Sequence, residues 1–125
     1  GLSGMLIPQF DLIFLGMGSD GHTASLFPET MALKEETRWV VSNFVPCRGL
    51  TRLTLTFPIL NQGRNIVFLV SGSNKAAMLR IVLQGSQHSS FLPAELIRPQ
   101  SGQLMWFVDQ DAGSHLDGIE EVQIA

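Results

Sequence analysis

The chain has 125 residues, of which 45% are hydrophobic and 15% charged, and its formal net charge is −3. A chain of this length forms one domain or part of one, and its acidic balance argues against a nucleic-acid partner, which requires a basic patch. The single cysteine, Cys47, excludes an internal disulfide and is typical of a reducing compartment, so we expect a cytoplasmic protein. The longest apolar runs have the length of strands, which predicts neither a membrane span nor a signal peptide.

In chain order, the first half predicts strands separated by short turns. We expect strand 10–15, a short helix over 22–27, a loop or helical turn over 29–36, strand 38–44, a turn over 46–49, strand 51–56 and a helical turn over 57–63. The first of these strands is largely apolar, whereas residues 51–56 alternate polar and apolar side chains. That alternation is typical of a half-buried strand.

The second half predicts one long helix between two strands. We expect strand 65–70, helix 73–84, a polar loop over 86–91, a turn over 92–96, strand 103–108 and a short helix from Asp109 that leads into a mobile tail over 112–125. The long helix has Ser73 as its expected N-cap and Gly85 as its stop. Its apolar face is formed by Ala76, Leu79, Val82 and Leu83.

Continuous apolar strands such as 65–70 are of the kind that helices bury on both faces. We therefore predict an α/β fold with an open, mainly parallel sheet and flanking helices. The sequence shows neither internal repeats nor a linker, so residues 1–125 are expected to form a single domain.

Three glycines and two ionisable side chains follow the first strand, at Gly16, Gly18, Asp20, Gly21 and His22. Ligands of open α/β sheets bind beyond the carboxyl ends of strands, and glycine lets the backbone approach a ligand closely. Asp20 is a favourable N-cap for the short helix expected here, which would place His22 at the positive end of that helix. Such a position favours neutral imidazole, the form that a general base requires.

The same glycines also satisfy the dinucleotide-binding fingerprint Gly-x-Gly-x-x-Gly. That fingerprint opens a long helix and is followed by an acidic residue at the end of the next strand. Here Pro28 would interrupt such a helix, and Glu35 and Glu36 precede the next strand instead of ending it. We therefore favour a catalytic role for the side chains over dinucleotide binding.

Residues 16–28, Gly-Met-Gly-Ser-Asp-Gly-His-Thr-Ala-Ser-Leu-Phe-Pro, closely resemble the signature of the 6-phosphogluconolactonases, the lactone hydrolases of the pentose phosphate pathway. Segments 51–58, 67–76 and 92–109 follow in the order expected of that family, so the resemblance extends to about Asp111. Family members are substantially longer, and the chain resembles their C-terminal half. The resemblance implies a Rossmann-like fold of the sugar-phosphate isomerase and lactonase type that lacks its N-terminal part.

The resemblance also implies hydrolysis of 6-phospho-D-glucono-1,5-lactone to 6-phospho-D-gluconate, with no cofactor and no metal. His22 would take a proton from the attacking water and return it to the leaving ring oxygen. Asp20 would orient the loop and the imidazole, and backbone N–H groups from Gly18 to Gly21 would face the developing oxyanion. The expected partner is a small sugar-phosphate lactone, and we expect that an N-terminal segment of the same protein is missing.

A second candidate site follows the strand at 65–70, where Gly72 and Ser73 lead into the start of a helix that can bind an anion. Lys75 in the first turn is unfavourable for a lone helix, and a bound phosphate would reverse that effect. By resemblance, Lys75 matches the family's phosphate-contacting lysine, and Arg52 stands where the family carries an arginine. Arg48 lies close enough in sequence to play the part of Arg52, and the choice stays open.

Two other functions stay open. Glucosamine-6-phosphate isomerases and deaminases carry a related segment that continues as Ala-Phe-Asn-Glu-Pro, whose Glu takes part in ring opening. Here Phe27 precedes Pro28, and phenylalanine cannot move a proton. A non-catalytic sugar-phosphate-binding module is the other alternative.

Covalent and metal-assisted routes have less support in the sequence. No Gly-x-Ser-x-Gly segment is present, so a serine nucleophile is not indicated. His22, His88 and His115 lack the paired spacing of metal motifs. We expect His88 and His115 to be exposed to solvent.

Overall fold

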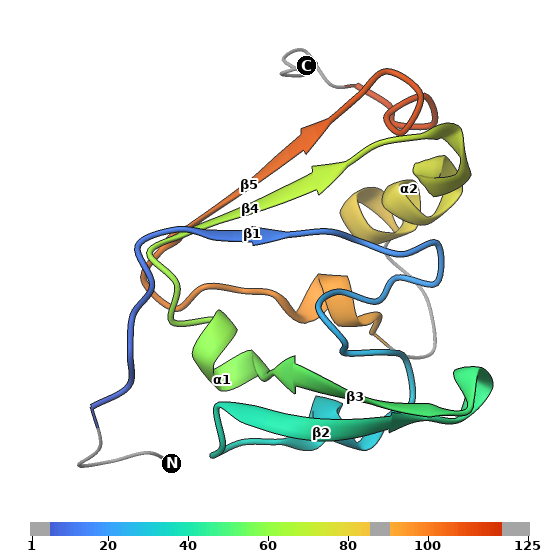
Figure 1. Cartoon of the computed structure of the whole chain (residues 1–125). Helices are drawn as coiled ribbons and strands as arrows, with labels where there is room; N and C mark the ends of the chain where they lie inside the picture. The colour runs from blue at the N-terminus through green and yellow to red at the C-terminus, as the bar shows by residue number, and fades with distance from the viewer. Residues whose placement is uncertain (1–5, 86–90, 119–125) are drawn as a thin grey trace.

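The computed structural model describes residues 6–85 and 91–118 (Figure 1). Within these ranges the chain forms the strands β1 (Ile13–Leu15), β2 (Val40–Val45), β3 (Leu50–Leu55), β4 (Asn65–Val70) and β5 (Gln103–Val108). The α-helices of the same ranges are α1 (Phe57–Leu60) and α2 (Ala76–Gln84). Short 3-10 helices lie at η1 (Met31–Lys34), η2 (Pro46–Arg48), η3 (Ser73–Lys75) and η4 (Pro93–Leu96).

Three of the strands form a parallel sheet in the order β1-β4-β5 (Figure 1). Ile66 in the central strand pairs with Ile13 on one side and with Leu104 on the other. The buried face of this sheet and the helix α2 belong to one core, in which Phe68 and Leu79 are fully buried. The predicted α/β fold with an open, mainly parallel sheet is confirmed.

The opposite face of the same sheet is apolar and largely open to solvent. Phe14, Leu69 and Met105 are 62%, 52% and 40% exposed, respectively, and the residues directly before and after each of them point to the other face of the sheet. We predicted strands buried on both faces. Among the described residues, α2 packs against one face of the sheet and leaves Phe14, Leu69 and Met105 on the other face exposed.

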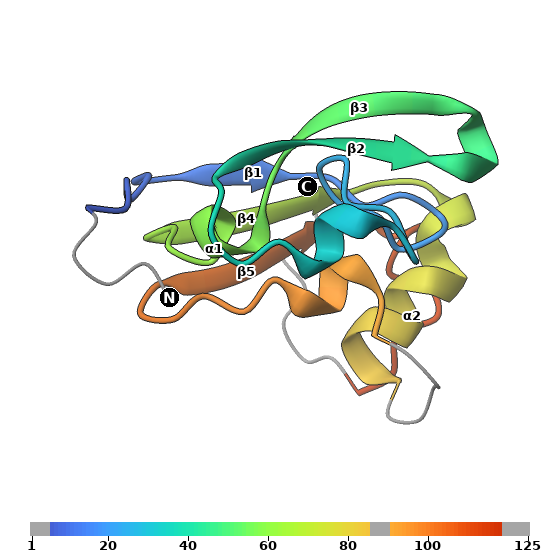
Figure 2. The same cartoon turned by 90° about the horizontal axis from the view of Figure 1, so that it is seen from below.

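The strands β2 and β3 pair with each other in an antiparallel hairpin, from Val40 opposite Leu55 to Val45 opposite Leu50. The turn between them is η2, which ends at Gly49 with a φ of +61°. Figures 1 and 2 show this hairpin apart from the parallel sheet and beside the loop that follows β1. The strands predicted over 38–44 and 51–56 are confirmed with slightly shifted bounds.

The short helix predicted over 22–27 is wrong. Thr23 and Leu26 instead form a tight antiparallel bridge, in which each backbone N–H donates to the other residue's carbonyl, at 3.3 and 2.9 Å. Ala24 within this turn has a φ of +51°, which a right-handed helix does not allow. Asp20 therefore caps no helix, and His22 does not lie at a helix terminus.

The long helix predicted from Ser73 to Gln84 is confirmed, but its beginning differs. It starts as η3 and continues as α2, and Gly85 follows its last residue, as predicted. Gly72 occupies the N-cap position in place of Ser73, and no side chain caps this end. Leu83 is 38% exposed, so the buried face is narrower than predicted.

The helix predicted from Asp109 is wrong, because residues 110–115 form successive turns. One of these turns is closed by the Gly113 N–H, which donates to the Asp109 carbonyl. Residues 86–90 of the predicted loop, with His88, and residues 119–125 of the predicted tail lie outside the described ranges. Among the residues that are described, no helix combines the length and the hydropathy needed to cross a membrane.

Candidate active site

The loop that follows β1 folds back on itself through its own backbone. The Gly18 N–H donates to the His22 carbonyl at 2.9 Å, and the Gly21 N–H donates to the Gly18 carbonyl at 3.0 Å. The Thr23 hydroxyl closes the loop by donating to the Gly16 carbonyl at 2.8 Å. The N–H groups of Gly18 and Gly21 are thus used inside the loop, and in this conformation they are not free to donate to an oxyanion.

Asp20 and His22 form a hydrogen-bonded pair inside this loop. The Asp20 Oδ1 atom lies 2.6 Å from the His22 Nδ1 atom and accepts a second hydrogen bond, at 3.0 Å, from the His22 backbone N–H. Burial alone would raise the pKa of Asp20, but these hydrogen bonds outweigh it, and the pKa is lowered from its ordinary value of 3.8. Asp20 is therefore an ionised hydrogen-bond acceptor at neutral pH.

This pairing decides which nitrogen of His22 can act as a base. A carboxylate has no proton to donate, so Nδ1 carries the ring proton and Nε2 keeps its lone pair. The side chain of His22 is 24% exposed, so the ring is held by its neighbours and still reaches solvent. The arrangement suits a general base whose imidazolium form is stabilised by a neighbouring carboxylate.

Gly18 lies directly against this pair. A Cβ atom at position 18 would lie 2.1 Å from the His22 Nδ1 atom and 2.8 Å from the Asp20 Oδ1 atom. Any side chain larger than hydrogen would therefore displace the imidazole. The position requires glycine because the backbone approaches the pair so closely.

Phe27 stacks on His22 and Arg48 lies over Phe27, and the sequence did not reveal either contact. The rings of His22 and Phe27 stack with their centroids 4.2 Å apart and their planes inclined by 20°. The Arg48 guanidinium lies 5.0 Å from the centroid of the Phe27 ring. Arg48 belongs to the turn of the β2–β3 hairpin, so no sequence spacing could have indicated this contact.

Lys75 reaches the same loop from the other candidate site. Its Nζ atom donates a 2.6 Å hydrogen bond to the Met17 carbonyl oxygen. Lys75 follows β4 and Met17 follows β1, and these parallel strands are neighbours in the sheet (Figure 1). The structure therefore brings the loop of His22 and the turn of Lys75 together at one edge of the sheet.

The turn before Lys75 is already occupied by a carboxylate. The Gly72 N–H donates to Asp109 at 3.2 Å from Oδ1 and 3.3 Å from Oδ2, and the Ala112 N–H donates to Oδ1 at 2.8 Å. Gly72 has a φ of +98°, a conformation that favours glycine. Ser73 is exposed to solvent. Because Asp109 takes the Gly72 N–H, this group is not free for the anion that the sequence predicts at this turn.

The two arginine candidates both belong to the hairpin. Arg52 lies in β3 opposite Asn43 and, by strand alternation, shares a face with the buried Thr54. Arg48 lies at the hairpin turn and contacts Phe27. Of the two, Arg48 is the one with a described contact to Phe27, which stacks on His22.

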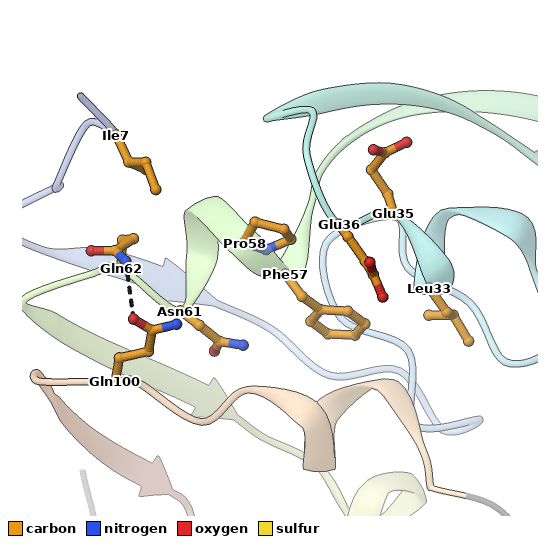
Figure 3. Close-up of a pocket in the computed structure, with 9 residues that line it drawn as sticks. All are labelled: Ile7, Leu33, Glu35, Glu36, Phe57, Pro58, Asn61, Gln62 and Gln100. Carbon is orange, nitrogen blue, oxygen red and sulfur yellow. Dashed lines mark hydrogen bonds between the residues drawn. The ribbon is translucent and has the colours of Figure 1, made fainter. Parts of the chain in front are cut away.

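A separate cavity of about 480 Å³ lies beside α1 (Figure 3). It is lined by Ile7, Leu33, Glu35, Glu36, Phe57, Pro58, Asn61, Gln62 and Gln100. None of the predicted site residues takes part, and its two carboxylates disfavour a phosphorylated ligand. Within the described ranges, no three histidine, cysteine, aspartate or glutamate side chains are grouped to hold a metal, and His115 is exposed.

The sequence profile described as "Glucosamine-6-phosphate isomerases/6-phosphogluconolactonase" matches residues 2–106. The chain belongs to this family. A probable 6-phosphogluconolactonase of Arabidopsis thaliana is 43% identical over 117 residues, which cover 88% of the chain and 42% of the relative. The human 6-phosphogluconolactonase is 44% identical over 107 residues, covering 85% of the chain and 41% of the relative.

The family's solved structures agree with the fold. The crystal structure of 6-phosphogluconolactonase from Leishmania guyanensis superposes with a TM-score of 0.79 at 29% identity, over 94% of the chain and 47% of that protein. The chain thus spans less than half the length of these relatives. The resemblance deduced from residues 16–28 is confirmed, and so is the expectation that the chain corresponds to part of the family domain.

Proposed function

We propose that the chain carries the general base and part of the phosphate site of an enzyme that hydrolyses 6-phospho-D-glucono-1,5-lactone to 6-phospho-D-gluconate. The observation that supports this proposal best is the pairing of Asp20 with His22 inside the loop that Lys75 also contacts. A base and a cation at one sheet edge suit a substrate with an electrophilic carbon and a phosphate. The relatives named 6-phosphogluconolactonase support the same substrate.

The proposed reaction uses His22 twice. Its Nε2 atom accepts a proton from water as the water oxygen attacks the lactone carbonyl carbon, and the Asp20 carboxylate stabilises the imidazolium. When the bond between the carbonyl carbon and the ring oxygen breaks, His22 returns the proton to that oxygen, which leaves as a hydroxyl group. The products are a carboxylic acid and an alcohol, so the step needs no redox cofactor. An aldonolactone is an activated ester, so the step needs no metal either.

The phosphate of the substrate would bind to Lys75 together with an arginine of the hairpin. A guanidinium group offers paired N–H donors that match phosphate oxygens. We favour Arg48, because it contacts Phe27, which stacks on His22. Arg52 is the alternative. We also propose a cytoplasmic location, for which a single cysteine is typical, and a place in the oxidative pentose phosphate pathway, to which the proposed lactone belongs.

The test supplies the part of the family domain that the chain does not span. In a chimera, the chain replaces the matching segment of the human relative, and acid release from the lactone is compared with the spontaneous rate. Acceleration that requires the phosphate group supports the proposal. A folded chimera that binds 6-phosphogluconate without accelerating hydrolysis would establish the non-catalytic binding module instead, and release of ammonia from glucosamine 6-phosphate would establish the deaminase.

A further inference from the structure

We infer that the β2–β3 hairpin holds the His22 loop in its reactive position, and that Asn43 and Thr54 are positioning residues for His22. The inference deepens the proposed function, and its activity measurement rests on that function. The NMR measurement of the His22 ring does not depend on the proposed function. Neither residue belongs to the loop, and both lie far from it in sequence.

Asn43 in β2 connects the hairpin to the loop through its side-chain amide. Its Nδ2 group donates to the Ser25 carbonyl and to the Thr30 hydroxyl, each at 2.9 Å, and its Oδ1 atom accepts from the Ala32 N–H at 3.2 Å. Asn43 is 1% exposed. A buried amide with three partners fixes all of them, because losing any one leaves a buried polar group unpaired.

Thr54 in β3 fixes the other backbone group of the same residue. Its hydroxyl oxygen accepts from the Ser25 N–H at 3.1 Å and donates to the Leu55 carbonyl at 2.8 Å. The backbone N–H and carbonyl of Ser25 are therefore both bonded to hairpin side chains. Thr54 is 4% exposed, so water does not readily replace this contact.

The segment that these hairpin contacts hold contains a residue with a strained backbone. Ala24 has a φ of +51°, a left-handed conformation that costs a non-glycine residue free energy and persists only where its surroundings impose it. Ser25 follows directly, and the bridge between Thr23 and Leu26 encloses both residues. The hairpin contacts on Ser25 thus hold the strained turn shut.

The turn that the hairpin holds is connected to His22 at both of its ends. Thr23 follows His22 in the chain and anchors the loop at Gly16, and Phe27 after the turn stacks on the imidazole. The Arg48 guanidinium over the Phe27 ring adds a third contact from the hairpin. If the turn opened, Phe27 would move relative to the imidazole, and the short hydrogen bond to Asp20 would lengthen.

The experiment compares Thr54→Val with Thr51→Val. Both remove one hydroxyl group from β3 at nearly constant volume, but Thr51 is exposed and lies opposite Phe44 on the other face of the strand. Long-range ¹H–¹⁵N spectra of the 125-residue chain report which ring nitrogen of His22 is protonated, and low-field ¹H spectra report exchange of its Nδ1 proton. The variants His88→Gln and His115→Gln assign the signals. Thermal unfolding confirms that each variant is folded, and Asn43→Ala is examined in the same way.

We expect Thr54→Val to shift the His22 ring signals and to speed exchange of the Nδ1 proton, while Thr51→Val matches the unmodified chain. In the chimera, Thr54→Val should lower kcat by about 10- to 100-fold with KM within about twofold, as for a misplaced base. Folded Thr54→Val with unshifted His22 signals and unchanged kcat overturns the inference and leaves the proposed function intact. Shifted signals in a chain whose chimera hydrolyses no lactone would support the inference and refute the proposed function.

Discussion

The Lys75 ammonium group donates a 2.6 Å hydrogen bond to the Met17 carbonyl oxygen across a separation of 58 residues in sequence. This contact joins the turn after β4 to the loop after β1, which carries Asp20 and His22. It places a positive charge on the rim of the candidate active site. The backbone carbonyl satisfies the ammonium group only in part, since an ammonium group has three protons to donate.

Lys75→Met should therefore raise KM for the phosphorylated lactone more than it changes kcat. A lost charge-assisted hydrogen bond corresponds to a roughly 10- to 100-fold rise. An unphosphorylated gluconolactone should be hydrolysed at a nearly unchanged rate by the same chimera. Lys34, the chain's other lysine, is exposed in η1 and provides the control variant Lys34→Met. Equal losses on both substrates would show that Lys75 does not recognise phosphate.

Gly18→Ala should disrupt the Asp20–His22 pair. The added methyl group would overlap the imidazole, so the ring must leave its position or the loop must open. We expect kcat to fall by about 100-fold, the effect of a misplaced catalytic group. Gly16→Ala is the control, because a Cβ atom there would meet nothing within 4 Å. Comparable activity of the two variants would mean that the imidazole does not act from the described position.

The Asp20 carboxyl group predicts a pH dependence of stability. Because its pKa is lower in the folded chain than the ordinary value of 3.8, it stabilises the fold above about pH 4. This contribution is lost as the pH falls through the lowered pKa. The difference in Tm between the unmodified chain and Asp20→Asn should thus shrink as the pH is lowered from about 4 toward 2. A difference that stays constant down to pH 2 would contradict the lowered pKa.

Ala24→Gly tests the strain in the turn held by the hairpin. Glycine adopts a φ of +51° without steric cost, which offsets the entropy it loses on folding. We expect its free energy of unfolding to stay within about 0.5 kcal/mol of the unmodified chain. Ala77→Gly on the exposed side of α2 is the control and should lose about 1 kcal/mol. Equal losses in urea denaturation would show that Ala24 is not strained.

The sequence could predict the elements that depend on local pattern. Periodicity and stop signals are local features of a sequence. They made it possible to recognise the apolar strands β4 and β5 and the helix that Gly85 terminates. The short helix over 22–27 was predicted wrongly, because the conformation of Ala24 depends on hairpin side chains that bind Ser25. A pattern of neighbouring residues contains no information about such distant contacts.

The candidate site was predictable to a similar extent. Asp20 and His22 lie two residues apart, so their pairing follows from one loop, and the parallel order of strands brings Lys75 to the same edge. The stacking of Phe27 and the approach of Arg48 depend on how the hairpin docks. The hydrogen bond from the Gly72 N–H to the Asp109 carboxylate likewise depends on the pairing of β4 with β5.

The most direct test of His22 as the general base is the rate of lactone hydrolysis by the chimera with His22→Ala, measured above the spontaneous rate at neutral pH. Removal of a general base should lower kcat by about 10²- to 10⁴-fold, while binding of 6-phosphogluconate persists. A folded His22→Ala chimera that turns over at the rate of the unmodified chimera would contradict the proposed mechanism.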